Sequence, residues 1–327
     1  MTGILPIKKY NTESALNNFD EYTMLDPATM APYIGFTEEE VKPLCEKYST
    51  DFNDIKAWYD GYEFKRLGSI YSPFSVVKCL TRQQIGNYWI DTSTAEAAKD
   101  YINMNIDGLK EDVIRLTLGQ RVPVRVGSFA NDFVSLYNKD QVMTLLIHLG
   151  YLAYDAENKE AYVPNNEVKE KLKESIEDSN WDFFVQAVKE SKDLVNSVLR
   201  GNCDKVSSII EKNHLALSSY FTFNNEADLT MAILISFIAA NENYEPIREF
   251  TSGYGRADVC YLPNKGVSTP PMVIELKRNE DSSVALAQII DKKYSAKLRG
   301  YNEVIALGIN YDEKDKNYTA KLETLKL

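Results

Sequence analysis

Histidine is scarce in this sequence, and its scarcity removes several kinds of catalytic and metal site. Only His148 and His214 occur among 327 residues, and neither lies beside another histidine or a cysteine. A histidine-rich metal site is therefore excluded, and a Ser-His or Cys-His catalytic pair is disfavoured. If the protein is an enzyme, we expect carboxylates and lysines to carry its chemistry.

Cysteine pairs and long apolar runs are also missing. The four cysteines never fall into a C-x-x-C spacing, which favours reduced, mostly buried thiols over a zinc site or disulfides. The longest run dominated by apolar residues, Met231 to Ala240, has ten residues, about half of what a bilayer requires. Residues 1–9 lack the apolar stretch and cleavage site of a secretion signal. We therefore expect a cytoplasmic protein that does not contact a membrane.

The net charge of −11, from 37 basic and 48 acidic residues, at first disfavours binding to phosphate backbones. The acidity is uneven, however, because residues 1–215 carry −9 and residues 216–327 only −2. Basic residues cluster in the second stretch: Lys277, Arg278, Lys292, Lys293, Lys297 and Arg299. A local basic face there could bind nucleic acid weakly and with strong salt dependence.

The remaining composition, 44% hydrophobic and 26% charged, is that of a globular protein with two or three domains. Thr37 followed by Glu40 is a capping-box pattern and predicts the start of a helix. Residues 55–80 are dense in aromatics, which could stack on bases. A small aromatic core under a loop is the interpretation we favour for them.

Residues 141–173 follow the order helix, strand, turn, strand, helix, which outlines a winged-helix-like module. The stretch mixes acids with its lysines, so a packing or lid module is favoured over direct DNA contact. The next segment, residues 174–215, is predicted to form charged helices of a solvated connector.

The C-terminal third predicts an α/β domain with one helix-covered sheet. A buried helix is expected over residues 226–240, an amphipathic helix over residues 283–298, and strands over 247–250, 257–262, 272–276 and 303–309, with a closing segment from Tyr318.

Three polar residues in these strands form the candidate active site. Asp258 follows the glycine turn Gly253-Tyr-Gly-Arg-Ala, while Glu275 and Lys277 alternate along an apolar strand and so share a face. A hairpin-like connection between the two strands would bring Asp258 beside them. Two carboxylates and a lysine at a sheet end suit Mg²⁺ or Mn²⁺ and phosphate chemistry.

The triplet Glu-x-Lys has no value alone. It also begins at Glu40, Glu63, Glu157, Glu167 and Glu190, where we expect charged pairs on a solvated surface for most. Only Glu275 lies in an apolar strand, where a carboxylate is costly unless paired or metal-bound.

The C-terminal region resembles the PD-(D/E)XK nuclease superfamily, in particular the nuclease-like domain of bacterial and archaeal AAA-ATPase-like proteins. The resemblance rests on Asn225-Glu-Ala-Asp-Leu-Thr230, Arg248 to Asp258, Ile274-Glu-Leu-Lys277 and Ala287-Gln-Ile-Ile-Asp-Lys-Lys-Tyr294. It implies Asp258 and Glu275 as metal ligands, Lys277 as the catalytic lysine and Glu226 as an accessory acid. It also implies that Gln288 and Tyr294 lie beside the site. Helix-dipole stabilisation for Glu226, and helix packing for Gln288 and Tyr294, stay open as alternatives.

The N-terminal part is similar to the end of the ATPase module of those proteins, at Thr2-Gly-Ile-Leu-Pro-Ile7, Gly35 to Val41, Trp58-Tyr-Asp-Gly-Tyr62 and Ile147-His-Leu-Gly-Tyr151. No glycine is followed by lysine, so the G-x-x-x-x-G-K-[ST] phosphate loop is absent. We therefore predict a natural or engineered truncation without ATP binding or ATPase activity. The expected limits are an ATPase remnant over 1–30, helical and winged-helix-like parts over 31–175, a connector over 176–215 and the nuclease-like domain over 216–327.

The function predicted from these features is Mg²⁺- or Mn²⁺-dependent hydrolysis of DNA. Two alternatives remain: a catalytically silent nuclease fold that binds nucleic acid or a partner, and a structural remnant with no nucleic-acid role. A homodimer that pairs two sites also stays open.

Overall fold

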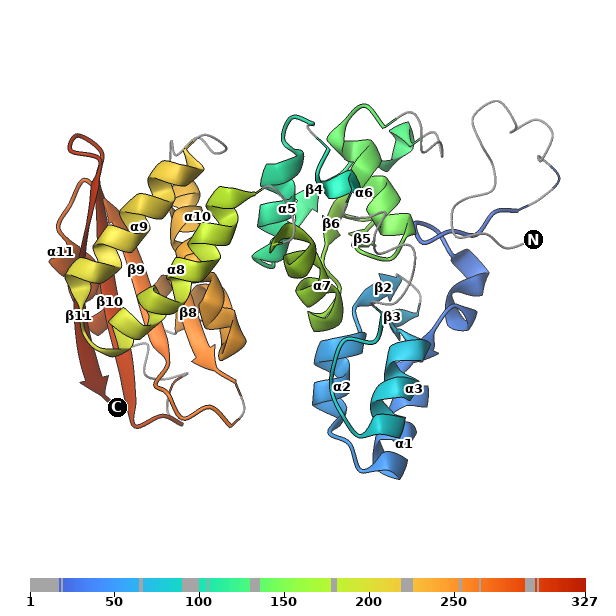
Figure 1. Ribbon diagram of the computed structural model, residues 1–327. Helices are drawn as coiled ribbons and strands as arrows, with labels where there is room; N and C mark the ends of the chain where they lie inside the picture. The colour runs from blue at the N-terminus through green and yellow to red at the C-terminus, as the bar shows by residue number, and fades with distance from the viewer. Residues whose placement is uncertain are drawn as a thin grey trace. The chain divides into compact units, whose positions relative to one another are not determined.

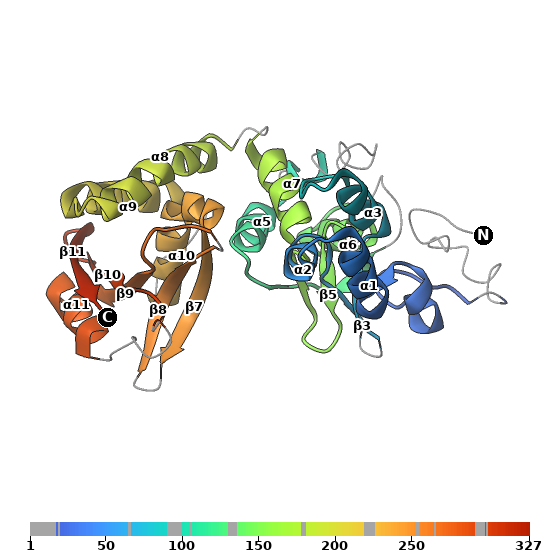
Figure 2. The same cartoon turned by 90° about the horizontal axis from the view of Figure 1, so that it is seen from below.

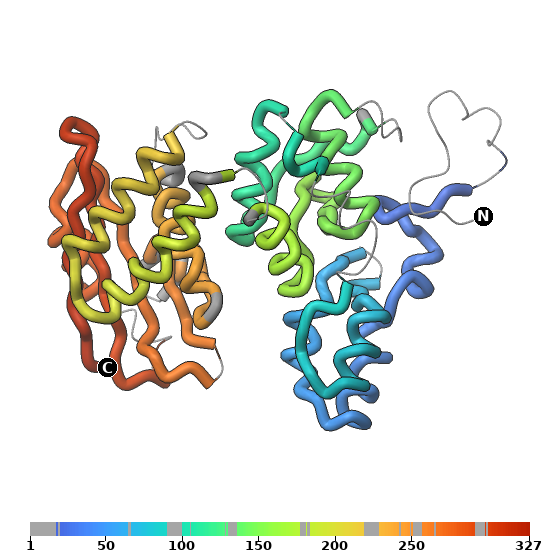
Figure 3. The backbone as a smooth tube through the Cα atoms, in the orientation of Figure 1, coloured from blue at the N-terminus to red at the C-terminus, as the bar shows by residue number. Residues whose placement is uncertain are grey.

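The chain forms two compact units, Met1–Asn180 and Trp181–Leu327. The computed structural model describes residues 18, 20–64, 67–89, 100–104, 106–129, 136–177, 181–218, 226–252, 255–264, 266–291, 298 and 300–327. Figure 1 labels their helices and strands, and the path of the chain can be followed in Figure 3. None of the helices in these ranges is long and apolar enough to cross a membrane.

The first unit begins with a helical part around a small sheet. Its elements are η2 (Ala28–Tyr33), β1 (Phe36–Thr37), α1 (Glu38–Tyr48), α2 (Phe52–Tyr59), β2 (Tyr62–Phe64), β3 (Gly68–Tyr71) and α3 (Pro73–Arg82), with the antiparallel sheet order β1-β3-β2. The predicted capping box is confirmed, since the Glu40 N–H donates to Thr37 Oγ1 at 3.4 Å and the Thr37 N–H donates to Glu40 Oε2 at 2.8 Å.

The aromatic residues between 55 and 80 are buried or half-buried with one exception, in line with the favoured interpretation. Tyr59 and Tyr71 are fully buried in one cluster with Cys45 and Cys79. Phe74 is the exception, because its side chain is exposed. Three of the four cysteines, Cys45, Cys79 and Cys260, are buried thiols.

The second part of this unit has the predicted order helix, hairpin, helix. Its elements are α5 (Leu109–Thr117), β4 (Val122–Pro123), η4 (Val126–Ser128), α6 (Lys139–His148), β5 (Ala153–Asp155), β6 (Glu160–Tyr162) and α7 (Asn166–Glu177), with the sheet order β4-β6-β5. Every residue of α6 from Val142 to His148 is buried. A helix buried on all these positions offers little surface to a DNA groove, so the structure favours the packing interpretation of this module.

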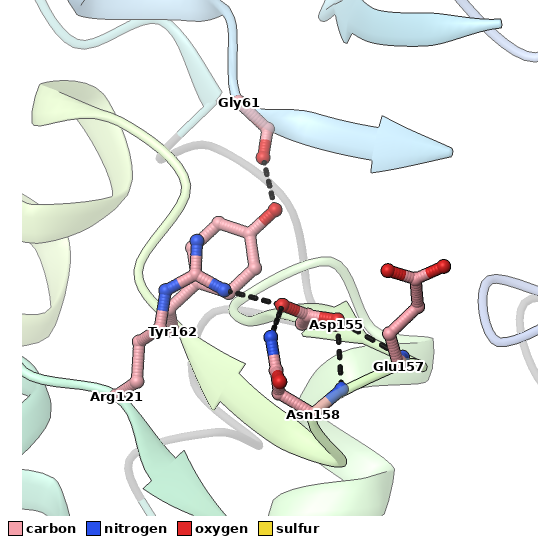
Figure 4. A network of polar contacts seen from close by, with 6 residues as sticks. All are labelled: Gly61, Arg121, Asp155, Glu157, Asn158 and Tyr162. Atoms are coloured by element: carbon pink, nitrogen blue, oxygen red, sulfur yellow. Dashed lines mark hydrogen bonds and ion pairs between the residues drawn. The ribbon is translucent and has the colours of Figure 1, made fainter. Parts of the chain in front are cut away.

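The turn Asp60-Gly61-Tyr62, between α2 and β2, contacts the second part of the first unit. The Tyr162 hydroxyl donates to the Gly61 carbonyl at 3.1 Å, beside the Arg121–Asp155 ion pair drawn in Figure 4, and the Asn165 side chain donates to the Asp60 carbonyl at 2.7 Å. Gly61 has φ +106°, and a Cβ there would lie 1.9 Å from the Pro164 carbonyl oxygen. Only glycine therefore fits this turn.

The second unit has three layers, because helices cover both faces of a five-stranded mixed sheet. Its elements are α8 (Asp182–Leu199), α9 (Cys203–Leu217), α10 (Glu226–Ser236), η5 (Ile238–Glu242), β7 (Tyr244–Ser252), β8 (Gly255–Pro263), β9 (Met272–Arg278), α11 (Ser282–Asp291), β10 (Glu303–Asp312) and β11 (Asn317–Lys326). The strand order is β11-β10-β9-β8-β7, in which β9 and β10 are parallel and the other pairs antiparallel. Figure 2 shows α8 and α9 on one side of the sheet and α11 on the other.

The helices of the expected connector belong to this unit. Residues 182–217 form α8 and α9, and α9 buries Val206, Ile210 and Leu217. The buried His214 ring bonds the Tyr318 hydroxyl of β11, with 2.8 Å between Nδ1 and the oxygen. The charged residues of α8 and α9 lie on the outer face of these helices. The charged pattern that predicted a solvated connector therefore belongs to the exposed side of helices that pack on the sheet.

Candidate active site

The site lies where β8 and β9 separate. Their antiparallel register runs from Tyr261↔Met272 to Val259↔Ile274, and one further step would place Asp258 opposite Glu275. At this point the Leu276 N–H donates to the Asp258 side chain, with 2.6 Å between N and Oδ2. The predicted proximity of Asp258 to the Glu-x-Lys triplet is therefore confirmed, and a carboxylate replaces the strand-to-strand hydrogen bond there.

Glu275 is a buried carboxylate in the middle of the sheet. Only 3% of the residue is exposed, and the first five residues of β9 are all buried. Lys277, two positions along the same face, places Nζ 3.3 Å from Glu275 Oε1, and 19% of its side chain is exposed. This ion pair offsets the desolvation of the carboxylate, while the ammonium remains within reach of solvent.

Helix α11 supplies a second donor to the same carboxylate. Gln288 Nε2 donates a hydrogen bond to Glu275 Oε1. The resemblance placed Gln288 beside the site, and the structure brings it there. One face of α11 thus touches the sheet at the carboxylate itself.

The close approach of α11 depends on Gly308, a residue that the sequence analysis did not single out. Gly308 is the β10 neighbour of Glu275 in the parallel register. A Cβ on Gly308 would lie 2.4 Å from both the Leu286 nitrogen and the Ser282 oxygen of α11. A glycine within an otherwise apolar strand often marks such a close backbone contact, and this signal was present in the sequence.

The loop after β9 is held by the end of β10. Asn310, which pairs with Lys277 in the parallel register, is buried, and its Oδ1 accepts the Glu280 N–H at 2.9 Å. Arg278 pairs with Glu313 at 2.7 Å, so this member of the expected basic face is partly neutralised within the chain. Hydrogen bonds from Asn279 and Arg278 hold the pKa of Glu313 below its usual value.

Several predicted site residues fall outside the described part of the structure. Glu226 begins α10, but its side chain is not described. Tyr294 and the basic residues Lys292, Lys293, Lys297 and Arg299 also lie outside the described residues. The structure thus brings together Asp258, Glu275, Lys277 and Gln288, and the remainder of the predicted set stays a prediction.

The donor chemistry of the site fits a hard divalent cation. Asp258 and Glu275 supply carboxylate oxygens, which are the ligands that Mg²⁺ and Mn²⁺ prefer in proteins. Among the described side chains, no group of three or more histidine, cysteine, aspartate or glutamate residues could hold a metal ion. A metal here would therefore rely on the two carboxylates together with water or substrate oxygens.

The other five Glu-x-Lys triplets differ in burial, and Glu190 is intermediate between the exposed and the buried ones. Glu40, Glu63 and Glu157 are exposed, as expected for charged pairs on a solvated surface. Glu167 departs from that expectation, because only 2% of the residue is exposed. Its Oε1 accepts the backbone N–H groups of Tyr88 at 2.7 Å and Trp89 at 3.1 Å, so it ties the start of α7 to the segment after α3.

Comparisons with known proteins agree with the geometry of the second unit. An uncharacterized protein in the vnfD 5′ region of Azotobacter chroococcum mcd 1 is 22% identical over 335 residues, covering 97% of this chain. This chain spans only 61% of the length of that relative. Residues 224–321 match the family model of the PD-(D/E)XK nuclease superfamily, and this segment holds Asp258, Glu275, Lys277 and Gln288. The resemblance of the C-terminal region to the PD-(D/E)XK nuclease superfamily is thereby confirmed for residues 224–321.

Proposed function

We propose that the segment 224–321 is a nuclease that hydrolyses the phosphodiester bonds of DNA with the help of Mg²⁺ or Mn²⁺. The observation that carries the proposal is the convergence of Asp258, Glu275 and Lys277 on two adjacent strands, where one register step beyond Val259↔Ile274 would place Asp258 opposite Glu275. The superfamily match to the same segment supports it.

Asp258 and Glu275 would hold the metal ion. When bound, the ion would polarise a phosphate oxygen and lower the pKa of a water molecule. Both carboxylates are fixed in place by this chain, since the Leu276 N–H holds Asp258 Oδ2 and Gln288 holds Glu275 Oε1. Such fixed ligands would not need to reorganise during the reaction.

Lys277 would act on the substrate. Its ammonium is held by Glu275 but is partly exposed, so a phosphate oxygen could approach Nζ without unfolding the site. There it would offset the negative charge that grows on the phosphate in the transition state, or orient the attacking water.

A second candidate function is a catalytically silent nuclease fold that binds nucleic acid or a partner. The observation that favours it is that Glu275 Oε1 already accepts from both Lys277 and Gln288, so this oxygen is occupied by donors of the chain itself. In this second candidate function, residues 1–30 and 31–175 would derive from an AAA-ATPase-like module that is coupled to the nuclease fold in full-length proteins of that kind.

Cleavage of single- and double-stranded DNA with Mg²⁺ or Mn²⁺ tests the choice between the two functions. We expect cleavage that is abolished by chelator and by Asp258→Ala or Glu275→Ala, and that is strongly lowered by Lys277→Ala. Lys326→Ala and Glu323→Gln are matched controls, because both residues are exposed on β11 of the same sheet. Equal residual cleavage by the wild type and Lys277→Ala would identify a contaminant. Tight binding without cleavage and without metal would support the silent module.

A further inference from the structure

The longest stretch of the chain without an acidic residue lies outside the nuclease-like segment. Residues 64–90 contain no aspartate or glutamate but four basic residues, Lys65, Arg66, Lys78 and Arg82. This stretch therefore carries +4, while the rest of the chain carries −15. A local charge of opposite sign in an acidic protein is a candidate for binding a polyanion.

Helix α3 carries two of these four basic residues, Lys78 and Arg82, on its outer face. Its inner face buries Val76, Cys79 and Leu80 in the core of the first unit. Five residues at helical spacing form the opposite side, which we call the α3 face: Phe74, Val77, Lys78, Thr81 and Arg82. Phe74 is 54% exposed and Val77 46%, which is high for apolar side chains beside two cations.

The two cations of the α3 face lie over aromatic rings. Lys78 Nζ is 5.5 Å from the centre of the Phe74 ring, and Arg82 Cζ is 5.4 Å from that of Tyr88. Within the described part of the chain, neither cation forms an ion pair with a carboxylate. Both remain available to an anion from outside the molecule.

A second lysine–aromatic cluster in the same unit provides the contrast. Lys42 and Lys56 lie over the Phe52 ring, at 5.2 and 6.0 Å. Both also pair with Glu38, at 2.6 and 2.9 Å, so an acid of this chain already compensates their charge. The α3 face differs because, among the described side chains, no acid pairs with Lys78 or Arg82.

We infer that the α3 face binds a single strand of nucleic acid, with phosphates at Lys78 and Arg82 and a base against Phe74. Single-strand binding surfaces combine cations that follow the backbone with exposed aromatic side chains on which bases stack. An acidic peptide would use the cations but would leave Phe74 and Val77 without a role. The inference goes beyond the proposed function, because the α3 face lies outside residues 224–321.

Fluorescence anisotropy with a labelled oligonucleotide of about 16 nucleotides tests this inference. Measurements are made in chelator, so that cleavage plays no part, at several salt concentrations. We compare the wild type with the triple variant Phe74→Ala/Lys78→Ala/Arg82→Ala and with the control Lys42→Ala/Lys56→Ala. The triple variant should bind about tenfold more weakly, with a log–log salt slope smaller by about 1.4 for two lost phosphate contacts. The control should bind like the wild type.

Three results would overturn the inference. The first is equal affinity of the triple variant and the wild type for the oligonucleotide, and the second is an equal affinity of the wild type for the duplex. The third is competition by polyglutamate as strong as that by unlabelled oligonucleotide, which would point to an acidic protein as the ligand. Thermal melting of each variant excludes unfolding as the cause of lost binding. Lys326→Ala, which removes an exposed lysine of β11, should bind like the wild type. Failure of the nuclease proposal, which appears as absent cleavage, is thus distinct from failure of this one.

Discussion

Glu167 and Glu275 begin the same Glu-x-Lys triplet and are equally buried, yet their surroundings differ in kind. Glu167, in the first unit, accepts backbone N–H groups from Tyr88 and Trp89 and so fastens one segment to another. Glu275, in the second unit, accepts from the side chains of Lys277 and Gln288 beside a second carboxylate. A buried carboxylate held by backbone donors stabilises the fold, whereas one held by ionisable and amide side chains beside a second carboxylate can serve chemistry.

The largest expected effect is a difference in cleavage rate between variants of the two lysines of these triplets, Lys277 and Lys169. Lys277→Ala should lower the cleavage rate about 10²- to 10³-fold, because it removes the charge that would stabilise the transition state. Lys169→Ala, in the triplet of Glu167, should leave the rate unchanged. Single-turnover cleavage at saturating Mn²⁺ measures both, and a similar loss in the two variants would remove the distinction between the regions.

The next largest effect concerns stability. Glu167→Ala leaves the N–H groups of Tyr88 and Trp89 without their acceptor, so it should lower the free energy of unfolding of the first unit by about 3 kcal/mol. Chemical denaturation followed by tryptophan fluorescence measures the change. Unchanged stability would show that Glu167 is not a structural anchor.

A smaller effect is expected at Gly308. An alanine there would push α11 away from the sheet and lower stability by about 2 kcal/mol, since its Cβ would meet the helix backbone at 2.4 Å. The same shift should withdraw Gln288 from Glu275 and so lower cleavage below that of an equally destabilised variant. Gly300→Ala, where a Cβ would meet no atom within 4 Å, is the control. Full activity in Gly308→Ala would mean that the position of α11 does not matter to the site.

The smallest effect is an acid response of the first unit. Burial lowers the pKa of His148 from 6.5 to about 4, so the folded protein binds fewer protons than the unfolded chain between these values. Stability should therefore fall as pH drops below 6.5, by about 1 kcal/mol at pH 5.5 from this group. Melting temperatures of the wild type and His148→Gln at pH 7.5 and 5.5 measure it. An equal fall in melting temperature between pH 7.5 and 5.5 in both proteins would contradict the lowered pKa of His148.

The sequence predicted the second unit better than the first. Short apolar runs indicated β8, β9 and β10, and the hairpin-like connection between β8 and β9 correctly predicted that Asp258 lies beside Glu275. The packing of α8 and α9 on the sheet was missed, because a charged outer face looks the same in a connector as in a covering layer. The burial of Glu167 was missed because its partners, the N–H groups of residues 88 and 89, are about 80 positions away and leave no side-chain signal.

The central claim is that Asp258 and Glu275 hold a divalent ion, and crystals soaked in Mn²⁺ test it most directly. The account predicts an anomalous difference peak between the two carboxylates, and its loss in Glu275→Gln but not in Glu167→Gln. Absence of the peak at a Mn²⁺ concentration that supports cleavage, or its persistence in Glu275→Gln, would contradict the account.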